Sequence, residues 1–420
     1  MTRGAPGRRA TLPLAAAAAS LLASCGLLST PANPELPTWV HRPSWSMTTV
    51  YRQPINAISR QETEPYERGR PELDIGSRRV FVGSSDRGLY AMRADDGAVL
   101  WRFETLGVVQ CEPLYDPQED VVYFGSNDGA LYKVRAADGA LLWRFETNAE
   151  VARRPVLLGS TVYAINANDT ILALDRRTGQ RNWSQHRTPA LGMEVAGYAG
   201  PLVWRGLVYA GFSDGTVTAY DAASGVERWQ PVDLSAEAEE ALGDVPRYLD
   251  VDTTPVPSII DESPVVFVGS YEGGVYALDA DNGSKVWQRP EVTGVSELVA
   301  WQQPGRPASA SSPAVPSRSL LFASSGTTGL WALDPRTGED VWHRPLPDGG
   351  VSAPVPIAGA LLVSTTLHGL YLMSPIDGSV IDGMHTGAGF SMAPAAYGLR
   401  AFILSNSGSL LSIHVTPPPT

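Results

Sequence analysis

The sequence contains only two cysteines in 420 residues, Cys25 and Cys111. It has no Cys-x-x-Cys pair, no His-Glu-x-x-His sequence and no P-loop, and its six histidines lack the spacing of a zinc site. These absences argue against the common zinc-binding and nucleotide-binding classes. No cofactor and no metal site is expected, and Cys111, within VVQCEPLY, is interpreted as a small buried apolar residue.

Basic residues are also scarce. The chain has 32 Lys and Arg against 44 Asp and Glu, a formal net charge of −12, and the first 24 residues hold three of the arginines and no acid. Proteins bind nucleic acids through clustered Lys and Arg, so a nucleic-acid partner is not expected. Otherwise the composition, 43% hydrophobic and 18% charged, is that of a folded globular protein.

Long apolar runs are missing except for Leu12–Leu22 (LPLAAAAASLL), which is too short to span a bilayer comfortably. Arginines precede this run and small residues follow it, which is the pattern of a secretory signal peptide. The segment ends in LASC, which resembles the bacterial lipobox, where the signal is cut before a cysteine that becomes lipidated. We predict a lipoprotein signal peptide over residues 1–24 and lipidation, palmitate included, of Cys25. The alternative is an ordinary signal peptide with a chance cysteine.

Residues 25–37 are predicted to hold the lipidated cysteine and a flexible tether, because proline, serine and polar residues dominate this stretch. Several acyl chains attach a protein more firmly than a single one does. Gly26 follows Cys25, without the aspartate that retains enterobacterial lipoproteins in the inner membrane. The sequence thus predicts attachment to the outer membrane, on its periplasmic face.

Repetition dominates the rest of the sequence. A Gly-x-x-x-Trp pattern occurs six times with Trp-to-Trp steps of 42, 40, 46, 58 and 55 residues, and a seventh copy has Asp382 in the tryptophan position. A period near forty residues indicates a repeat architecture. The six tryptophans are Trp101, Trp143, Trp183, Trp229, Trp287 and Trp342.

Each repeat predicts four strands. Two apolar runs joined by a polar, glycine-containing turn are typical of a β-hairpin, a short strand precedes them, and the tryptophan strand follows. Eight such units fit residues 38–416, leaving a tail at 417–420. The fold class is therefore all-β, an eight-bladed β-propeller of four-stranded antiparallel blades. The last unit has only three strands, so an N-terminal strand within Pro37–Trp45 is expected to join it and close the ring.

The recurring tryptophans are interpreted as structural docking residues between blades, because large aromatic side chains at one place in every blade bury extensive area. Stacking on a ligand is the alternative. Asp382 predicts one blade at which this contact differs.

Two insertions interrupt the repeats, at about 231–258 and 292–312. The first contains RYLDVDTTP, with Asp250 and Asp252 two residues apart and Arg247 nearby. On residue types alone this stretch fits a solvated acidic loop as well as a contact site. The second places Leu298, Val299 and Trp301 in a loop that is otherwise rich in Pro, Ser and Gly, where cover over a rim and partner contact are both open.

The stretches ALDADNGSKVW and ALDPRTGEDVW resemble the PQQ-type propeller repeat family. Together with the lipobox, eight blades and PRYLDVDTTPV, the chain resembles the lipoproteins of the outer-membrane barrel-assembly machinery within that family. The resemblance implies a non-enzymatic periplasmic scaffold, a monomer within a complex, that docks on the POTRA region of a BamA-type protein. It also implies two contact loops on one rim.

One implied contact loop carries over onto Arg247, Asp250 and Asp252. The other matches Thr188–Pro201, where Leu191, Met193 and Val195 supply apolar side chains but the arginine of the family pattern is missing. That departure leaves open a propeller scaffold for another envelope complex. A PQQ-binding quinoprotein enzyme with calcium is a further alternative, although those enzymes are longer and usually carry adjacent cysteines, which this sequence lacks.

Overall fold

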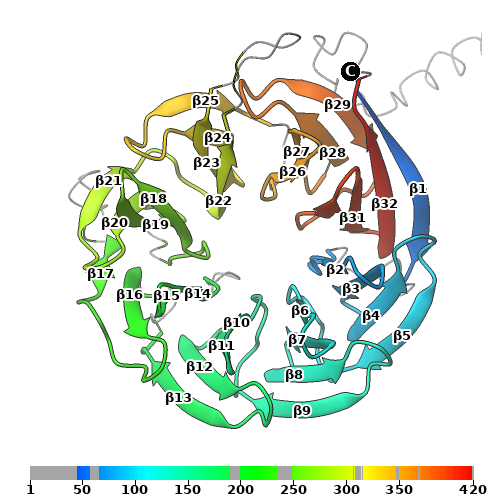
Figure 1. The fold of residues 1–420 in the computed structure, drawn as a ribbon, viewed down its shortest axis with the longest axis horizontal. Helices are drawn as coiled ribbons and strands as arrows, with labels where there is room; N and C mark the ends of the chain where they lie inside the picture. Colours follow the sequence, from blue (N-terminus) through cyan, green and yellow to red (C-terminus); the bar gives the residue numbers. More distant parts are fainter. Residues whose placement is uncertain are drawn as a thin grey trace, which may run out of the picture. The chain divides into compact units, whose positions relative to one another are not determined.

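The computed structural model describes residues 45–56, 66–189, 199–234, 236, 248, 250–305, 307, 314, 316–346, 350–367 and 369–418. The chain divides into two units, Met1–His41 and Arg42–Thr420, and the description below concerns the second. Its strands form eight four-stranded antiparallel sheets arranged as the blades of a ring (Figure 1). The predicted eight-bladed β-propeller is confirmed.

The strands are given from the innermost to the outermost of each blade. Blade 1 is β2 (Glu72–Asp74), β3 (Arg79–Gly83), β4 (Gly88–Arg93) and β5 (Val99–Glu104), and blade 2 is β6 (Leu114–Asp116), β7 (Val121–Gly125), β8 (Ala130–Arg135) and β9 (Leu141–Glu146). Blade 3 is β10 (Val156–Leu158), β11 (Thr161–Asn166), β12 (Thr170–Asp175) and β13 (Arg181–His186), and blade 4 is β14 (Leu202–Trp204), β15 (Leu207–Gly211), β16 (Thr216–Asp221) and β17 (Val232–Asp233).

Blade 5 is β18 (Val256–Ile260), β19 (Ser263–Ser270), β20 (Gly274–Asp279) and β21 (Lys285–Arg289), and blade 6 is β22 (Val295–Gln303), β23 (Arg318–Ser325), β24 (Gly329–Leu333) and β25 (Asp340–Arg344). Blade 7 is β26 (Val355–Ile357), β27 (Ala360–Ser364), β28 (Gly369–Met373) and β29 (Val380–His385). Blade 8 is β30 (Ala395–Tyr397), β31 (Arg400–Ser405), β32 (Ser409–Thr416) and β1 (Ser46–Pro54).

The two middle strands of each blade are apolar along almost their whole length because both of their faces are covered by neighbouring blades. All five residues of β3 and all five of β7 are buried. One apolar cluster joins Phe81 and Leu89 of blade 1 to Val122 and Phe124 of blade 2. The core of this protein is therefore a series of interfaces between blades.

The strand direction gives the ring two faces. The turns between second and third strands, and the connections from one blade to the next, lie together on one face, which we call the loop face. The turns between first and second strands and between third and fourth strands lie on the opposite side, the hairpin face. The described ends of both predicted contact loops, at 188–189, 199–201 and 250–255, lie between consecutive blades and therefore belong to the loop face.

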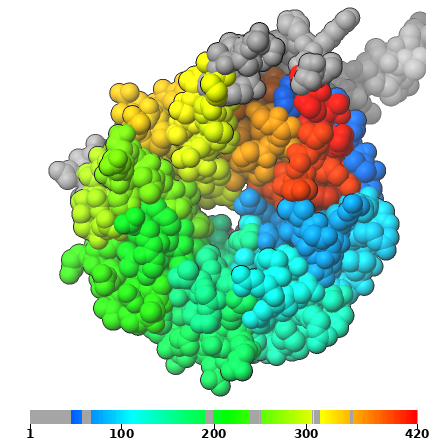
Figure 2. Space-filling model, viewed as in Figure 1, coloured from blue at the N-terminus to red at the C-terminus, as the bar shows by residue number. Residues whose placement is uncertain are grey.

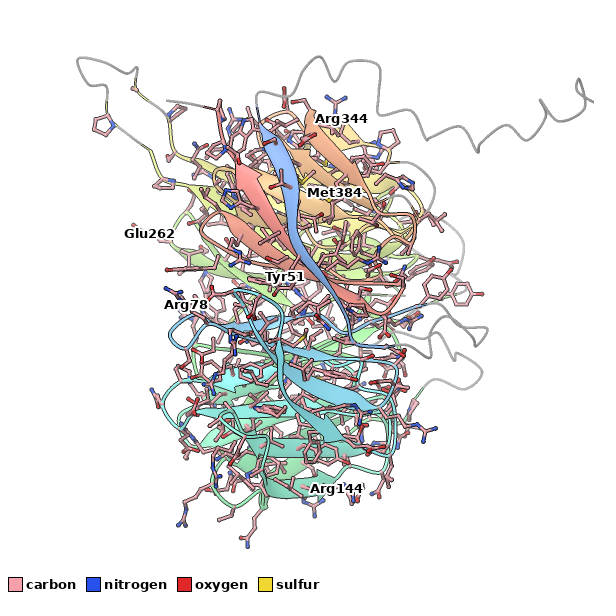
Figure 3. The ribbon with its side chains drawn as sticks, turned by 90° about the vertical axis from the view of Figure 1, so that its right-hand side faces the viewer. Tyr51, Arg78, Arg144, Glu262, Arg344 and Met384 are labelled. Carbon is pink, nitrogen blue, oxygen red and sulfur yellow. The ribbon has the colours of Figure 1, made fainter. Side chains whose placement is uncertain are left out.

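The ring is closed by β1, which pairs antiparallel with β32 from Ser46 opposite Thr416 to Pro54 opposite Ser409 (Figure 3). Closure by an N-terminal strand is confirmed, but its predicted position within Pro37–Trp45 is wrong, since the strand begins at Ser46. Most of β1 is polar because an outermost strand has one face in water. The more apolar stretch just before it therefore gave a misleading signal.

Six blades pack on the next blade through the recurring tryptophan. A Cβ added to Gly139 would lie only 2.8 Å from the ring of Trp101, and Gly139 has a φ of 73°. The Trp101 Nε1 donates a hydrogen bond to the Ala136 carbonyl at 3.0 Å. The same ring-on-glycine contact recurs for Trp143 on Gly179, Trp183 on Gly225, Trp229 on Gly283, Trp287 on Gly338 and Trp342 on Gly378.

The seam between blades 7 and 8 is built differently, at the position of Asp382. Blade 8 takes its outermost strand from the other end of the chain, so no third-to-fourth-strand turn is present there to receive a tryptophan. Instead, Asp382 Oδ2 accepts a hydrogen bond from the Met47 backbone N–H at 2.8 Å, and Thr49 Oγ1 donates to Met384 Sδ at 3.6 Å. Asp382 therefore binds the closing strand.

The second insertion is not the loop that its composition suggested. Val295–Gln303 form β22, which pairs with β23 through eight residue pairs. Trp301 packs against Phe322 with ring centroids 6.2 Å apart. The available strand signal was the apolar run Leu298–Trp301, and the Pro- and Ser-rich residues after it obscured it.

Candidate functional site

A repeated connection builds the centre of the loop face. Before the first strand of a blade, the chain carries valine followed four residues later by proline, as in Val109–Pro113, Val151–Pro155 and Val251–Pro255. The three valines press on Gly83, Gly125 and Gly211, at the ends of second strands, where an added Cβ would collide with them. The valine and proline of the DVDTTP segment therefore belong to a repeated structural element, whereas its pair of aspartates does not recur in the other two connections.

The residue that follows the valine faces the central channel in most of these connections. A hollow of about 620 Å³ lies there, and Figure 2 shows an opening at the centre of the ring. Its lining includes the residues at this position from five blades: Gln110, Ala152, Ser296, Ser352 and Ser391. The hollow is predominantly lined by small and polar side chains.

Charged groups of both signs reach the hollow. Arg68 is exposed at its edge, and Arg153 lines it. The acidic members are Glu150, which accepts from Asn127 Nδ2 at 2.9 Å, and Glu297, which accepts from the Ala353 N–H at 3.2 Å. Hydrogen bonds of this kind hold the carboxylates against the wall.

An ion-pair network ties the first strands of blades 1 to 3 together. Arg154 binds Glu72 at 2.9 Å and also contacts Glu112, and Arg70 lies 3.3 Å from Glu112. These carboxylates raise the pKa of the Arg154 guanidinium against the opposing effect of its burial. The network fixes the inner wall of the channel at three blades.

Asp250 and Asp252 lie inside the protein, with exposed fractions of 3% and 6%. They are not part of a solvated acidic loop, and Asp252 does not contribute to the lining of the hollow, to which its equivalents Gln110 and Ser296 belong. Both oxygens of Asp250 and Oδ1 of Asp252 are buried without a hydrogen-bond partner. Burial, then the neighbouring Asp250 carboxyl, raises the pKa of Asp252 to about 8.

Backbone hydrogen bonds hold the aspartates in place. The Val251 N–H donates to the Phe212 carbonyl at 3.1 Å, and the Tyr271 N–H donates to the Asp250 carbonyl at 3.3 Å. Arg153 Nη2 donates to the Asp252 carbonyl at 3.0 Å. The segment is thus fastened to blades 3, 4 and 5, which sequence spacing could not reveal.

The two predicted contact loops meet at their described ends. The Gly200 N–H donates to Thr254 Oγ1 at 3.0 Å, and a Cβ on Gly200 would approach Thr254 and Arg153. Leu191, Met193, Val195 and Arg247 lie outside the described residues, as does Cys25. The described anchors of both loops therefore share one place on the loop face, while most of the predicted contact side chains stay untested.

Cys111 is fully buried, and burial raises the pKa of its thiol to about 12. Its Sγ donates to backbone carbonyls, at 3.1 Å to Arg153 and 3.2 Å to Glu112. A thiol held in this way is a poor nucleophile, because the thiolate is the reactive form. The interpretation of Cys111 as a packing residue agrees with this placement.

Gly211–Gly215 read Gly-Phe-Ser-Asp-Gly, which matches the letters of a nucleophile elbow. The segment joins β15 to β16, whereas an elbow joins a strand to a helix. Ser213 Oγ donates directly to Asp169, whose pKa is raised mainly by burial. The match is therefore a strand-to-strand turn.

The described part of the chain contains no helix with the length and hydropathy of a membrane span. Within the same ranges, no group of three or more His, Cys, Asp or Glu side chains is arranged to hold a metal ion. The carboxylates of the hollow are spread around its wall and are individually hydrogen-bonded.

The fold and its ring-on-glycine seams define a propeller of the PQQ-type repeat class. A family model described as "Outer membrane protein assembly factor BamB" matches residues 115–300 and 298–383. The chain belongs to this family.

Two relatives and one solved structure illustrate the match. The BamB of Legionella pneumophila is 26% identical, in an alignment that covers 56% of this chain and 54% of the Legionella protein. The BamB of Yersinia pestis is 28% identical, in an alignment that covers 79% of this chain and 68% of the Yersinia protein. The crystal structure of BamB from Moraxella catarrhalis superimposes with a TM-score of 0.66 at 18% identity, over 88% of this chain and all of that one. The alignment with the Legionella protein thus spans about half of that relative.

Enzymes share the same repeats. A quinohemoprotein alcohol dehydrogenase of Pseudomonas putida is 26% identical over 54% of this chain, although the match covers only 36% of the enzyme. Similar identity to both kinds of protein means that the repeats alone do not distinguish a scaffold from an enzyme.

Proposed function

We propose that this protein is a non-enzymatic scaffold of outer-membrane β-barrel assembly, held at the periplasmic face of the outer membrane through lipid on Cys25. It docks through its loop face on the POTRA region of a BamA-type barrel protein. The observation that carries the proposal is membership of the BamB family over most of the propeller. The LASC sequence at Cys25 supports the anchor.

The joining of the two predicted contact loops supports the choice of the loop face. Gly200 and Thr254 connect the described ends of segments 188–201 and 247–255, so a single partner surface is able to touch both. In this proposal Leu191, Met193 and Val195 supply the apolar anchor that carries most of the affinity, and Arg247 contributes to orientation. Asp250 and Asp252 join the contact only after leaving their buried positions.

Affinity capture from detergent-solubilised envelope tests the proposal. The bait is the tagged full chain, compared with Thr254→Arg on the loop face and Tyr397→Arg on the hairpin face. Both positions are exposed. We expect the parent and Tyr397→Arg to recover a BamA-type protein and Thr254→Arg to lose it, with unchanged far-ultraviolet circular dichroism for all three.

Recovery of some other envelope protein in place of a BamA-type protein would favour a propeller scaffold for another complex. The missing arginine in segment 188–201 makes that outcome worth distinguishing. Equal recovery by all three baits would instead place the contact away from the Thr254 region.

A quinoprotein enzyme is the second candidate, favoured by the dehydrogenase relative. The acidic groups of the hollow do not fit a calcium–quinone site, because Glu150 and Glu297 are each committed to a hydrogen bond and no metal-binding group of three occurs among the described side chains. Calorimetric titration with the quinone and calcium is expected to show no binding. Saturable binding with quinone-dependent oxidation of an alcohol would contradict the scaffold.

A further inference from the structure

Two carboxyl groups buried side by side are unusual unless something compensates for their charge. Asp250 and Asp252 are almost completely buried, and three of their four oxygens have no hydrogen-bond partner. The Asp250 carboxyl lies close enough to raise the pKa of Asp252 further, in addition to the larger effect of burial, and this favours a proton on the Asp252 carboxyl. Two ionised carboxylates at this position would repel each other in a medium of low polarity.

The other blades show where Asp252 would otherwise lie. Its equivalents Gln110, Ser296 and Ser352 line the central hollow, whereas Asp252 is buried at the corresponding backbone position and is not part of that lining. A change of the Asp252 rotamer would therefore place its carboxylate in the hollow, where the equivalent polar side chains of other blades lie. The backbone bonds of Val251 and Thr253 to blades 4 and 5 do not need to break for this change.

We propose that Asp250 and Asp252 form a proton-linked latch on the loop face. In its closed state one proton is shared between the two carboxyl groups, and both side chains stay inside. When that proton passes to water, the pair carries two negative charges and Asp252 turns into the hollow, beside Arg153. The latch thus converts a buried, protonated Asp252 carboxyl into an exposed carboxylate.

The surroundings of the pair support this assignment. Arg153 faces it from the blade 2–3 connection and lowers the pKa of Asp252, but burial and Asp250 raise it by more. Titratable groups described on adjoining segments include Asp214 in the turn that holds Val251, together with Tyr248, Tyr271 and Glu272, and Glu272 accepts from the Tyr248 N–H at 3.0 Å. Arg153 therefore offsets only part of the effect of burial and of Asp250 on the pKa of Asp252.

The latch has a consequence for binding that rests on the proposed function. A partner with guanidinium or ammonium groups binds the open, doubly ionised state better than the closed state. By linkage, docking then releases a proton, and affinity rises as pH approaches the upper pKa of the pair. The closed state of the Asp250–Asp252 pair forms in the protein alone, without a bound partner.

Carboxyl-carbon NMR on the protein labelled at the aspartate side chains tests the latch without a partner. We expect at least one aspartate resonance to titrate with a midpoint near pH 8, while an ordinary aspartate titrates near pH 4. Asp252→Asn should remove that transition, and Asp261→Asn, at an exposed position, should preserve it. The latch is overturned if every aspartate titrates below about pH 6, or if the high transition survives Asp252→Asn.

Calorimetry with the purified POTRA region of a BamA-type protein tests the consequence. In buffers of different ionisation enthalpy at pH 7, the parent should release about one proton per complex and Asp252→Asn none. A complex without proton release would overturn the latch and leave the proposed function standing. If no complex forms at any pH, the proposed function fails, and the NMR titration alone decides the latch.

Discussion

Tyr51 of the closing strand lies over Gly97 of blade 1, in the place that a tryptophan occupies at the six other ring-on-glycine seams. An added Cβ on Gly97 would meet the Tyr51 ring at 2.6 Å, and Gly97 has a φ of 77°. The tyrosine hydroxyl also lies 3.5 Å from the Arg93 carbonyl. The N-terminal strand therefore supplies both the missing strand of blade 8 and its contact with blade 1.

The ring-on-glycine contact predicts a steric cost that a glycine in an open turn does not have. Gly139→Ala places a methyl group against Trp101, so we expect a loss of about 1–3 kcal/mol from overpacking in addition to about 1 kcal/mol for a positive φ. Gly159→Ala is the matched control, since Gly159 has a φ of 58° and nothing within 4 Å of an added Cβ. Urea unfolding measures both, and equal losses would refute the contact.

The seams between blades 4 and 5 and between blades 5 and 6 differ by one hydrogen bond. Trp287 Nε1 donates to the Pro335 carbonyl at 3.0 Å, whereas the buried Trp229 Nε1 has no partner. Replacement by phenylalanine removes the indole N–H in both cases. We expect Trp287→Phe to cost about 1 kcal/mol more than Trp229→Phe in the free energy of unfolding. A larger loss at Trp229 would contradict this difference.

Asp382 is predicted to stabilise the closed ring through its bond to Met47. Asp382→Ala leaves the Met47 N–H without its acceptor, and we expect a loss of about 1.5–3 kcal/mol because the acceptor is charged. Asp382→Asn retains a side-chain oxygen and should recover part of that stability. Thermal unfolding followed by circular dichroism measures both variants. Identical melting of the alanine and asparagine variants would mean that the hydrogen bond contributes nothing.

The Asp250–Asp252 pair predicts how stability changes with pH. The folded pKa of Asp252 is raised, so its contribution to stability is complete below the unfolded pKa near 4 and is lost as pH rises towards 8. Asp252→Asn is neutral at every pH. Urea unfolding at pH 5, 7 and 8.5 should therefore show the variant gaining stability relative to the parent as pH rises, and parallel curves would contradict the raised pKa.

The repeated features of the blades could be predicted from the sequence, whereas features that depend on contacts between distant residues could not. Because every blade must present a glycine and an aromatic ring to its neighbours, the pattern at Gly139 and Trp143 was visible along the chain. The burial of Asp252 was not, because residue type favours exposure for a carboxylate. Comparison of Val251–Pro255 with Val109–Pro113 does not reveal it either, because it matches Asp252 with Gln110, which lines the hollow.

Tyr51 was missed for a related reason. The closing strand needs only one side chain that imitates the tryptophan, and the rest of β1 is polar and half in solvent. A single aromatic residue in a polar segment carries no periodic signal. Its role follows only from the pairing of Tyr51 and its neighbours with the last strand of the chain.

Site-specific photo-crosslinking in living cells tests the central claim most directly. A photoreactive residue replaces Thr254 on the loop face in one variant and Tyr397 on the hairpin face in the other, with lipidation intact. We predict a crosslink from position 254 to a BamA-type protein and none from position 397. Crosslinking from position 397 alone, or to no BamA-type protein from either position, would contradict docking through the loop face.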